Sequence, residues 1–186
     1  WPPYLEHARD QIDKKVLQEI ADRKLPVYGN APDTTWGTTR EAALKQLDHF
    51  LNKAFSEFGA YEDAMTTKSW AVNHSLLSPY LNVGLLHAEE VVAAALKRFK
   101  KGDIPLAGAE GFIRQIIGWR EYINGLYWFF GDLYRAKNGL AATRPLLPLF
   151  EDSTKTKMNC VSTNVRDIEA RAWVHHIPRL MVLSNL

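Results

Sequence analysis

A long, strongly apolar helical pattern over residues 107–130 is the feature that most constrains the fold of this chain. Apolar side chains recur there every three or four residues, which is the period of one face of an α-helix. They are Phe112, Ile113, Ile116, Ile117, Ile123, Tyr127 and Phe130. The sequence therefore predicts one long helix in the second half of the chain.

Shorter helical patterns are found at three further places: residues 4–24, 38–58 and 89–101. Thr38 and Glu41 form a capping-box pattern that predicts a helix start, and Gly59 and Gly102 predict helix ends. No stretch of alternating apolar and polar residues is long enough to predict a sheet. We therefore predict an all-α fold, a globular helical array made by residues 1–186 as a single domain.

The composition is that of a folded protein, with 46% apolar and 11% aromatic residues in a chain of 186. A net charge of +2 gives no indication for or against a nucleic-acid partner. The one cysteine excludes an internal disulfide, and it cannot hold zinc or an iron-sulfur cluster by itself. No apolar run is long enough for a membrane span or a secretion signal, so we predict a cytoplasmic protein without a membrane partner.

Two serines precede a Ser-Pro pair in residues 74–84 (HSLLSPYLNVG). Ser78 is a good helix N-cap and Pro79 suits the first helical position, so unpaired backbone amides would face the residues before them. Together with the hydroxyl of Ser75, this pattern predicts an anion-binding geometry. Ordinary helix capping is the alternative.

Arg120 falls on the apolar stripe of the long helix, between Ile116 and Ile123. A buried charge needs a partner. That partner is either an internal carboxylate in a structural ion pair or a bound anion for which Arg120 acts as a clamp.

His175 and His176 open another helical segment, in which Pro178 fits only the first turn. They are either a structural pair or groups that titrate near neutral pH. A metal site is not expected from this pair, because neighbouring side chains on a helix diverge and no histidine follows one turn later. Cys160 on its own indicates a buried, inert thiol.

Three motifs, in this order along the chain, resemble the flavin-binding helical domain of the photolyase/cryptochrome family. They are residues 75–81 (SLLSPYL) with Gly84, residues 119–122 (WREY) and residues 175–180 (HHIPRL). The sequences of residues 58–65 and 157–160 resemble those of the iron-sulfur bacterial cryptochromes and (6-4) photolyases. The resemblance covers roughly residues 35–186.

The resemblance implies a role for each matching residue. It implies that Trp119 lines the DNA-facing pocket, that His175 and His176 support proton transfer at the lesion, and that Cys160 is the first of four ligands of a 4Fe-4S cluster. Leu180 replaces a second catalytic histidine of eukaryotic relatives, and Asp152 stands near the position of an aromatic electron relay. The FAD contacts implied are Tyr61, His74, Ser75, Leu76, Leu77, Ser78, Arg120 and Arg179.

The function implied is light-driven repair of pyrimidine photoproducts in damaged DNA, of the (6-4) type, by electron transfer from reduced FAD. A signalling cryptochrome without repair activity is the first alternative. An all-α interaction module without a cofactor is the second.

Both ends of the sequence indicate a fragment, because it opens on Trp1 and closes on the apolar run 179–186. We expect an antenna domain with its own chromophore before this region and the remaining cluster cysteines after it. We also expect the isolated chain to bind little FAD, to expose an apolar face and to self-associate through it.

Overall fold

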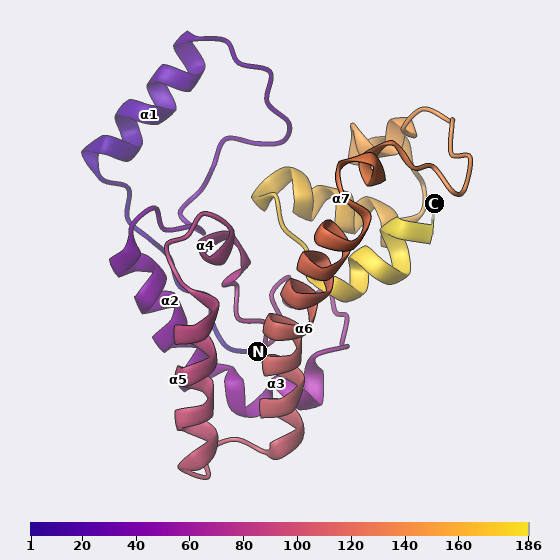
Figure 1. Ribbon diagram of the computed structural model, residues 1–186. Coiled ribbons are helices and arrows are strands. Elements are labelled where there is room, and N and C mark those ends of the chain that lie inside the picture. Colours follow the sequence, from indigo (N-terminus) through magenta and orange to yellow (C-terminus); the bar gives the residue numbers. More distant parts are fainter. Residues whose placement is uncertain (186) are drawn as a thin grey trace.

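The computed structural model describes residues 1–185 of the chain, and all regular secondary structure in that range is helical (Figure 1). The prediction of an all-α fold is thus confirmed. The seven α-helices of the described range are α1 (Gln11–Asp22), α2 (Arg40–Lys53), α3 (Phe55–Tyr61), α4 (Ser78–Asn82), α5 (Ala88–Lys100), α6 (Leu106–Phe130) and α7 (Asn159–Arg171). A π-helical turn, Pro178–Val182, follows α7.

The core lies between α2, α3, α5 and the first half of α6. Four phenylalanines from three of these helices form its centre, with ring centroids 4.7 to 6.1 Å apart: Phe50, Phe55, Phe58 and Phe112. All four side chains are buried. Aromatic pairs at such distances add about 0.5–1.5 kcal/mol each beyond the area that they bury, so this cluster fixes α6 against the other helices.

Gly59 does not end a helix, contrary to the prediction, because α3 continues through it to Tyr61. Gly59 instead faces Gly108 of α6 at very close range. A Cβ atom on Gly59 would lie 2.5 Å from the Cα of Gly108. The glycine is needed for close helix packing and not for a change of backbone direction.

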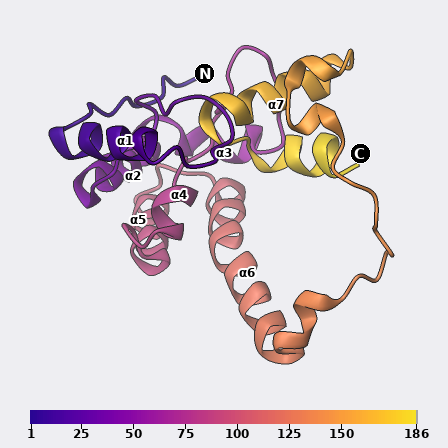
Figure 2. The ribbon, with the colours of Figure 1, turned by 90° about the horizontal axis from the view of Figure 1, so that it is seen from above.

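The second half of α6 extends away from the other helices, and the chain returns from it to α7 through a long connection (Figure 2). Only the first part of the predicted apolar stripe is buried, at Phe112 and Ile116. Ile123 and Tyr127 are 56% and 60% exposed. The predicted exposed apolar face is therefore present along this half of α6. No helix in residues 1–185 has both the length and the apolar character needed to cross a membrane.

The first helix begins later than predicted, at Gln11 instead of residue 4. Asp10 and Asp13 form a reciprocal capping box that fixes its start. No residue of α1 is buried, and Figure 1 shows it apart from the remaining helices. The second helix is likewise capped by Thr39, whose hydroxyl accepts a hydrogen bond from the amide of Ala42, and not by Thr38 as predicted.

The segment after α7 is directed back toward the core by a turn and by tryptophan contacts. Ala172 adopts a left-handed conformation with φ of 55°, which ends α7 and reverses the chain. The Trp36 indole donates a hydrogen bond of 2.9 Å to the carbonyl of Arg171, and the ring of Trp173 lies 5.4 Å from that of Trp70. These contacts place residues 173–176 beside residues 70–78.

Candidate functional site

A cavity of about 240 Å³ lies where three segments distant in sequence meet. The segments are residues 74–78, the middle of α6, and residues 173–179. The cavity brings together ten of the residues selected from the sequence: His74, Ser75, Leu76, Leu77, Ser78, Trp119, Arg120, His175, His176 and Arg179. Because these residues come from three separate motifs, their convergence could not follow from local sequence pattern.

Two of the selected residues lie elsewhere. Tyr61 packs its ring against Trp1, at 5.1 Å between centroids, and is 41% exposed. Cys160 is exposed in the first turn of α7 and lines a different cavity of about 450 Å³. The prediction that the Cys160 thiol is buried is therefore wrong. The Asp152 side chain accepts a hydrogen bond from the Thr154 amide, so it caps a short 3-10 turn.

The Ser-Pro segment is built differently from the prediction. Ser78 is the first residue of α4 and not its cap, and α4 has only five residues. The Ser78 hydroxyl accepts a hydrogen bond of 3.3 Å from the indole nitrogen of Trp173. Gln46 of α2 also holds the segment, because its side-chain amide donates a hydrogen bond of 3.0 Å to the carbonyl of Ser75.

The leucines of this segment have a structural task. Leu76 and Leu77 are both buried, with 5% and 1% of their surface exposed. Leu76 adopts a left-handed backbone conformation with φ of 58°. That backbone strain turns the chain so that both leucines enter the core while the neighbouring serines line the cavity.

The two arginines of the cavity have no ion-pair partner among residues 1–185. Arg120 is exposed, which contradicts the predicted burial, and it donates to the carbonyl of Ile116, one turn earlier, at 3.1 Å. The predicted internal carboxylate for Arg120 is therefore absent from the described residues. Arg179 reaches the same cavity from the π-helical turn. Two guanidinium groups without an ion-pair partner in the described part of the chain make this wall of the cavity suited to an anion.

Trp119 lies next to Arg120 on α6 and lines the same cavity. Its indole nitrogen donates a hydrogen bond of 3.1 Å to the side-chain oxygen of Gln115, and its side chain is 58% exposed. An aromatic face in this position is open to stacking by a flat ring.

The histidines form a group of three, because His74 joins the predicted pair. The ring of His74 stacks on that of His175, with centroids 4.5 Å apart, and lies edge-on to His176 at 5.4 Å. The pKa of His74 is lowered to about 3, chiefly by burial and also by the nearby His175 and His176. Burial likewise lowers the pKa of His175 to about 4, so both rings are neutral at pH 7.

Asp63 is a site residue that the sequence reasoning missed. Its carboxylate lies 3.1 Å from Nε2 of His176. The two residues are 113 positions apart in the sequence, so only the fold brings them together. The acidic pair Glu62 and Asp63 was the sole local signal, and such pairs are usually solvated.

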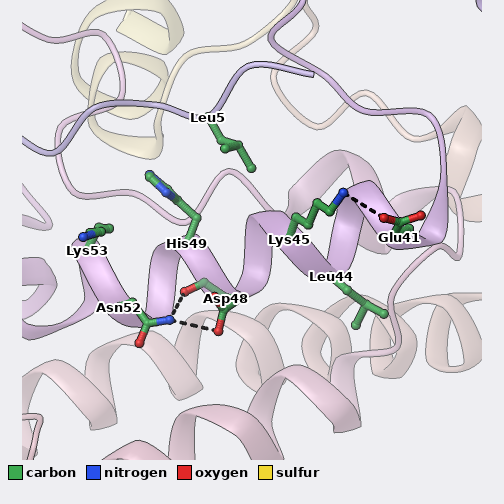
Figure 3. A pocket seen from close by; sticks show the side chains of 8 residues that line it. All are labelled: Leu5, Glu41, Leu44, Lys45, Asp48, His49, Asn52 and Lys53. Atoms are coloured by element: carbon green, nitrogen blue, oxygen red, sulfur yellow. Dashed lines mark hydrogen bonds and ion pairs between the residues drawn. The ribbon is translucent and has the colours of Figure 1, made fainter. Parts of the chain in front are cut away.

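A larger hollow, of about 740 Å³, lies away from this site (Figure 3). It runs along the exposed face of α2, below Leu5. Lys45 pairs there with Glu41 at 2.7 Å, and the Asn52 amide donates to the Asp48 carboxylate at 2.9 Å. Apart from Leu5, the residues that line this hollow come from α2 alone, so it lacks the converging groups of a binding site.

Comparison with known proteins places the chain in a family. It is 40% identical to a (6-4) photolyase of Agrobacterium fabrum (strain C58) over 185 residues, which is 99% of this chain and 36% of that protein. The chain belongs to the photolyase/cryptochrome family. It is also 24% identical over 167 residues to a deoxyribodipyrimidine photo-lyase of Vibrio cholerae, with 86% of this chain and 34% of that protein covered.

The match covers only part of the length of these photolyases. The chain spans about a third of the length of the two curated photolyases. An uncharacterized protein, R853, of Acanthamoeba polyphaga mimivirus is 38% identical over 68 residues, 36% of this chain and 52% of that protein. No protein-family model matches the chain.

Proposed function

We propose that the full-length protein containing this chain repairs pyrimidine photoproducts in DNA, of the (6-4) type, with FAD bound at the cavity of Arg120 and Arg179. One observation carries the proposal. Two arginines without carboxylate partners in the described residues share a cavity with two serine hydroxyls. The names of the two related photolyases, which describe photoproduct repair and its (6-4) form, support the reaction class.

The residues present fit the diphosphate part of FAD. Guanidinium groups and hydroxyls are the donors that phosphate oxygens accept from. The cavity of about 240 Å³ is smaller than the roughly 300–1,000 Å³ of sites that enclose a ligand of drug size. The described residues thus supply one wall, and we propose that other parts of the full-length protein complete it.

When bound, FAD supplies the light-driven electron for bond cleavage. The residues of this chain bind and orient. We assign Arg120, Arg179, Ser75 and Ser78 to the anionic part of the cofactor, and Trp119 to stacking against the flipped lesion. For His176 we propose proton transfer to the lesion, with Asp63 holding the imidazole in one orientation.

The iron-sulfur cluster does not fit the described residues alone. It requires four thiolates, and the chain has one cysteine, Cys160. We propose that the other three ligands, and the antenna chromophore, belong to parts of the full-length protein outside this chain. The self-association expected from the exposed half of α6 also remains a prediction.

The test measures two quantities in the full-length protein: bound FAD by its absorption, and light-dependent repair of an oligonucleotide with one (6-4) photoproduct. A hydrogen bond to a charged group contributes about 1.5–3 kcal/mol, so Arg120→Gln and Arg179→Gln should each weaken FAD binding about 10-fold to 150-fold. Arg114→Gln is the matched control, because Arg114 lies on α6, pairs with Glu110 and does not line the cavity.

His176→Ala should retain FAD and lose repair by about 100-fold to 10,000-fold, the usual range for acid-base help. FAD binding that is unchanged in both cavity arginine variants would refute the assigned site. Full FAD occupancy without repair of either a (6-4) photoproduct or a cyclobutane dimer would favour a signalling cryptochrome. Absence of flavin from the full-length protein would favour an interaction module.

A further inference from the structure

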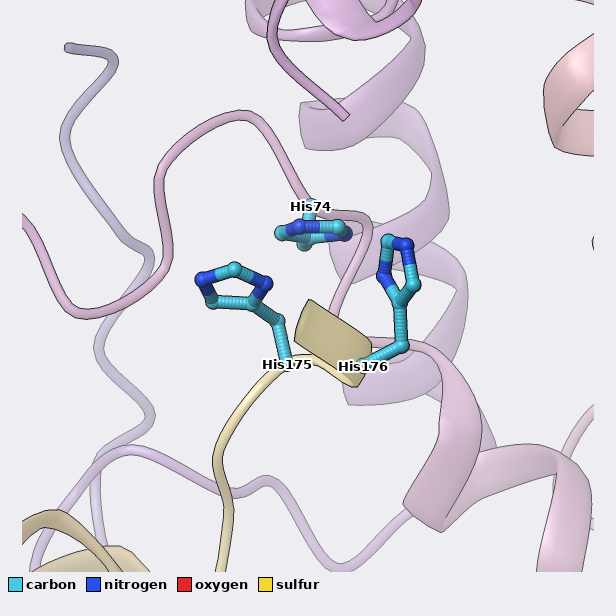
Figure 4. Close-up of side chains that lie close together, drawn as sticks. All are labelled: His74, His175 and His176. Carbon is cyan, nitrogen blue, oxygen red and sulfur yellow. The ribbon is translucent and has the colours of Figure 1, made fainter. Parts of the chain in front are cut away.

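Three imidazole rings from two distant segments converge at one place, as Figure 4 shows. One ring nitrogen each of His74, His175 and His176 lies within 4.8 Å of the other two. The expectation that the adjacent pair diverges is wrong, because His175 precedes the helical turn that His176 opens. The two side chains therefore do not follow helical directions, and both meet His74.

Buried lone pairs without a partner point to a missing ligand at this cluster. Nε2 of His74 and Nδ1 of His175 are both inaccessible to solvent, and neither has a hydrogen-bond partner among the described residues. His175 as a whole is only 5% exposed. Buried polar atoms are nearly always paired, and a neutral imidazole nitrogen is a metal ligand as well as a hydrogen-bond acceptor.

Outer contacts of the kind that orient metal-binding histidines are already in place. The carboxylate of Asp63 lies 3.1 Å from Nε2 of His176, which leaves Nδ1 of that ring for an ion. The His74 ring donates a hydrogen bond to the backbone of Glu62, while its Nε2 is unpartnered in the described residues. Histidine ligands of metals commonly hold their second nitrogen to a carboxylate or a backbone carbonyl in this way.

We propose that His74, His175 and His176 bind one divalent transition-metal ion, with Zn²⁺ as the preferred ion and Asp63 as an outer support of His176. Imidazole ligands suit Zn²⁺, Cu²⁺ and Ni²⁺, whereas Mg²⁺ and Ca²⁺ prefer oxygen ligands. Three protein nitrogens leave the fourth tetrahedral position for water. The negative charge of Asp63 offsets part of the repulsion from Arg179.

Binding requires a small rearrangement of the rings. Zinc-nitrogen bonds of about 2.0–2.1 Å place the nitrogens of a tetrahedral site about 3.3 Å apart. The rings of His74 and His175 are stacked at 24°, so one of them must turn for both lone pairs to meet one ion. The last torsion of a histidine side chain has a broad range, which permits that turn.

The test titrates the chelator-treated full-length protein with ZnCl₂ in a calorimeter, with MgCl₂ as the comparison ion. The expected result is one Zn²⁺ per chain that is lost, by more than about 100-fold in affinity, in His74→Gln and in His176→Gln. Asp63→Asn should weaken it about 10-fold to 100-fold, the usual effect of an outer support. His49→Gln is the matched control and should bind like wild type, because His49 is a half-buried histidine of α2 outside the cluster.

The comparison between variants isolates this site from other metal centres in the full-length protein. Co²⁺ in place of Zn²⁺ should give the intense visible absorption of a four-coordinate ion, and the His74 variant should lack it. Circular dichroism establishes that each variant is folded, and if one variant unfolds, the other decides. Equal Zn²⁺ affinity in wild type and in the folded His74 or His176 variant would overturn the proposal, as would binding of Mg²⁺ with the same strength. The proposal does not depend on flavin binding.

Discussion

Replacing Gly59 with Ala should destabilise the packing of α3 on α6, whereas Gly108→Ala in the same contact should not. A Cβ on Gly59 would lie 2.5 Å from the Cα and 2.7 Å from the amide nitrogen of Gly108. A Cβ on Gly108 would meet the amide nitrogen of Gly59 at 3.4 Å, an ordinary contact. The two glycines face each other, but only one of them has no space for a methyl group.

The magnitude follows from two opposing effects. Alanine in place of glycine inside a helix gains about 1 kcal/mol in helix propensity, and this applies to both positions. Forcing a methyl group against backbone costs about 1–3 kcal/mol in a packed core, and this applies to Gly59 alone. We therefore expect Gly59→Ala to lower the free energy of unfolding by up to about 2 kcal/mol, and Gly108→Ala to raise it by up to about 1 kcal/mol.

Urea denaturation followed by tryptophan fluorescence measures both variants on the same scale. The difference between them is more informative than either value, because helix propensity cancels in it. If Gly59→Ala is as stable as Gly108→Ala, the close approach of these two helices is incorrect. Since α6 also bears Trp119 and Arg120, the same result would question the position of the cavity wall.

Two further outcomes test the core and a surface ion pair. Phe112→Ala removes a ring that contacts Phe50, Phe55 and Phe58, so it should cost about 3–5 kcal/mol in the free energy of unfolding, and a loss below about 1 kcal/mol would contradict this core. The pKa of Glu90 is lowered to about 2, chiefly by its hydrogen bonds to Arg40, so the pair should stabilise the fold above about pH 4.5 and lose that effect as the pH falls toward 2. At neutral pH, Glu90→Gln should be less stable than wild type by about 1 kcal/mol or less, because the pair is partly solvated. When the free energy of unfolding is measured from pH 7 to 2, this difference between the variant and wild type should disappear at the acid end.

The helix positions that the sequence predicted best are those set by local signals. The structure places α5 and α6 within one residue of the predicted bounds, since Gly102 interrupts the chain between two clear helical periods. The prediction at Gly59 was wrong because glycine serves both as a helix end and as a site of close packing. Only the position of Gly108, distant in sequence, distinguishes these two uses.

The site was predictable to the extent that it depends on short motifs. Motif resemblance selected ten residues that share the cavity, although it could not place Tyr61 or Cys160. It also gave no indication of the contact between Asp63 and His176. Pairings of this kind depend on how the chain returns after Ala172, which is a property of the whole fold.

The charges of the cavity separate its two proposed uses. His74 and His175 are neutral at pH 7, because burial keeps their pKa values at about 3 and 4. The positive charge that attracts an anion therefore comes from the guanidinium groups of Arg120 and Arg179. Metal binding would rely on the lone pairs of neutral imidazoles, and anion binding on the guanidinium groups. A cation held by the histidines would add positive charge to the same cavity, so it would reinforce the attraction of a phosphate to the arginines while withdrawing His176 from proton transfer.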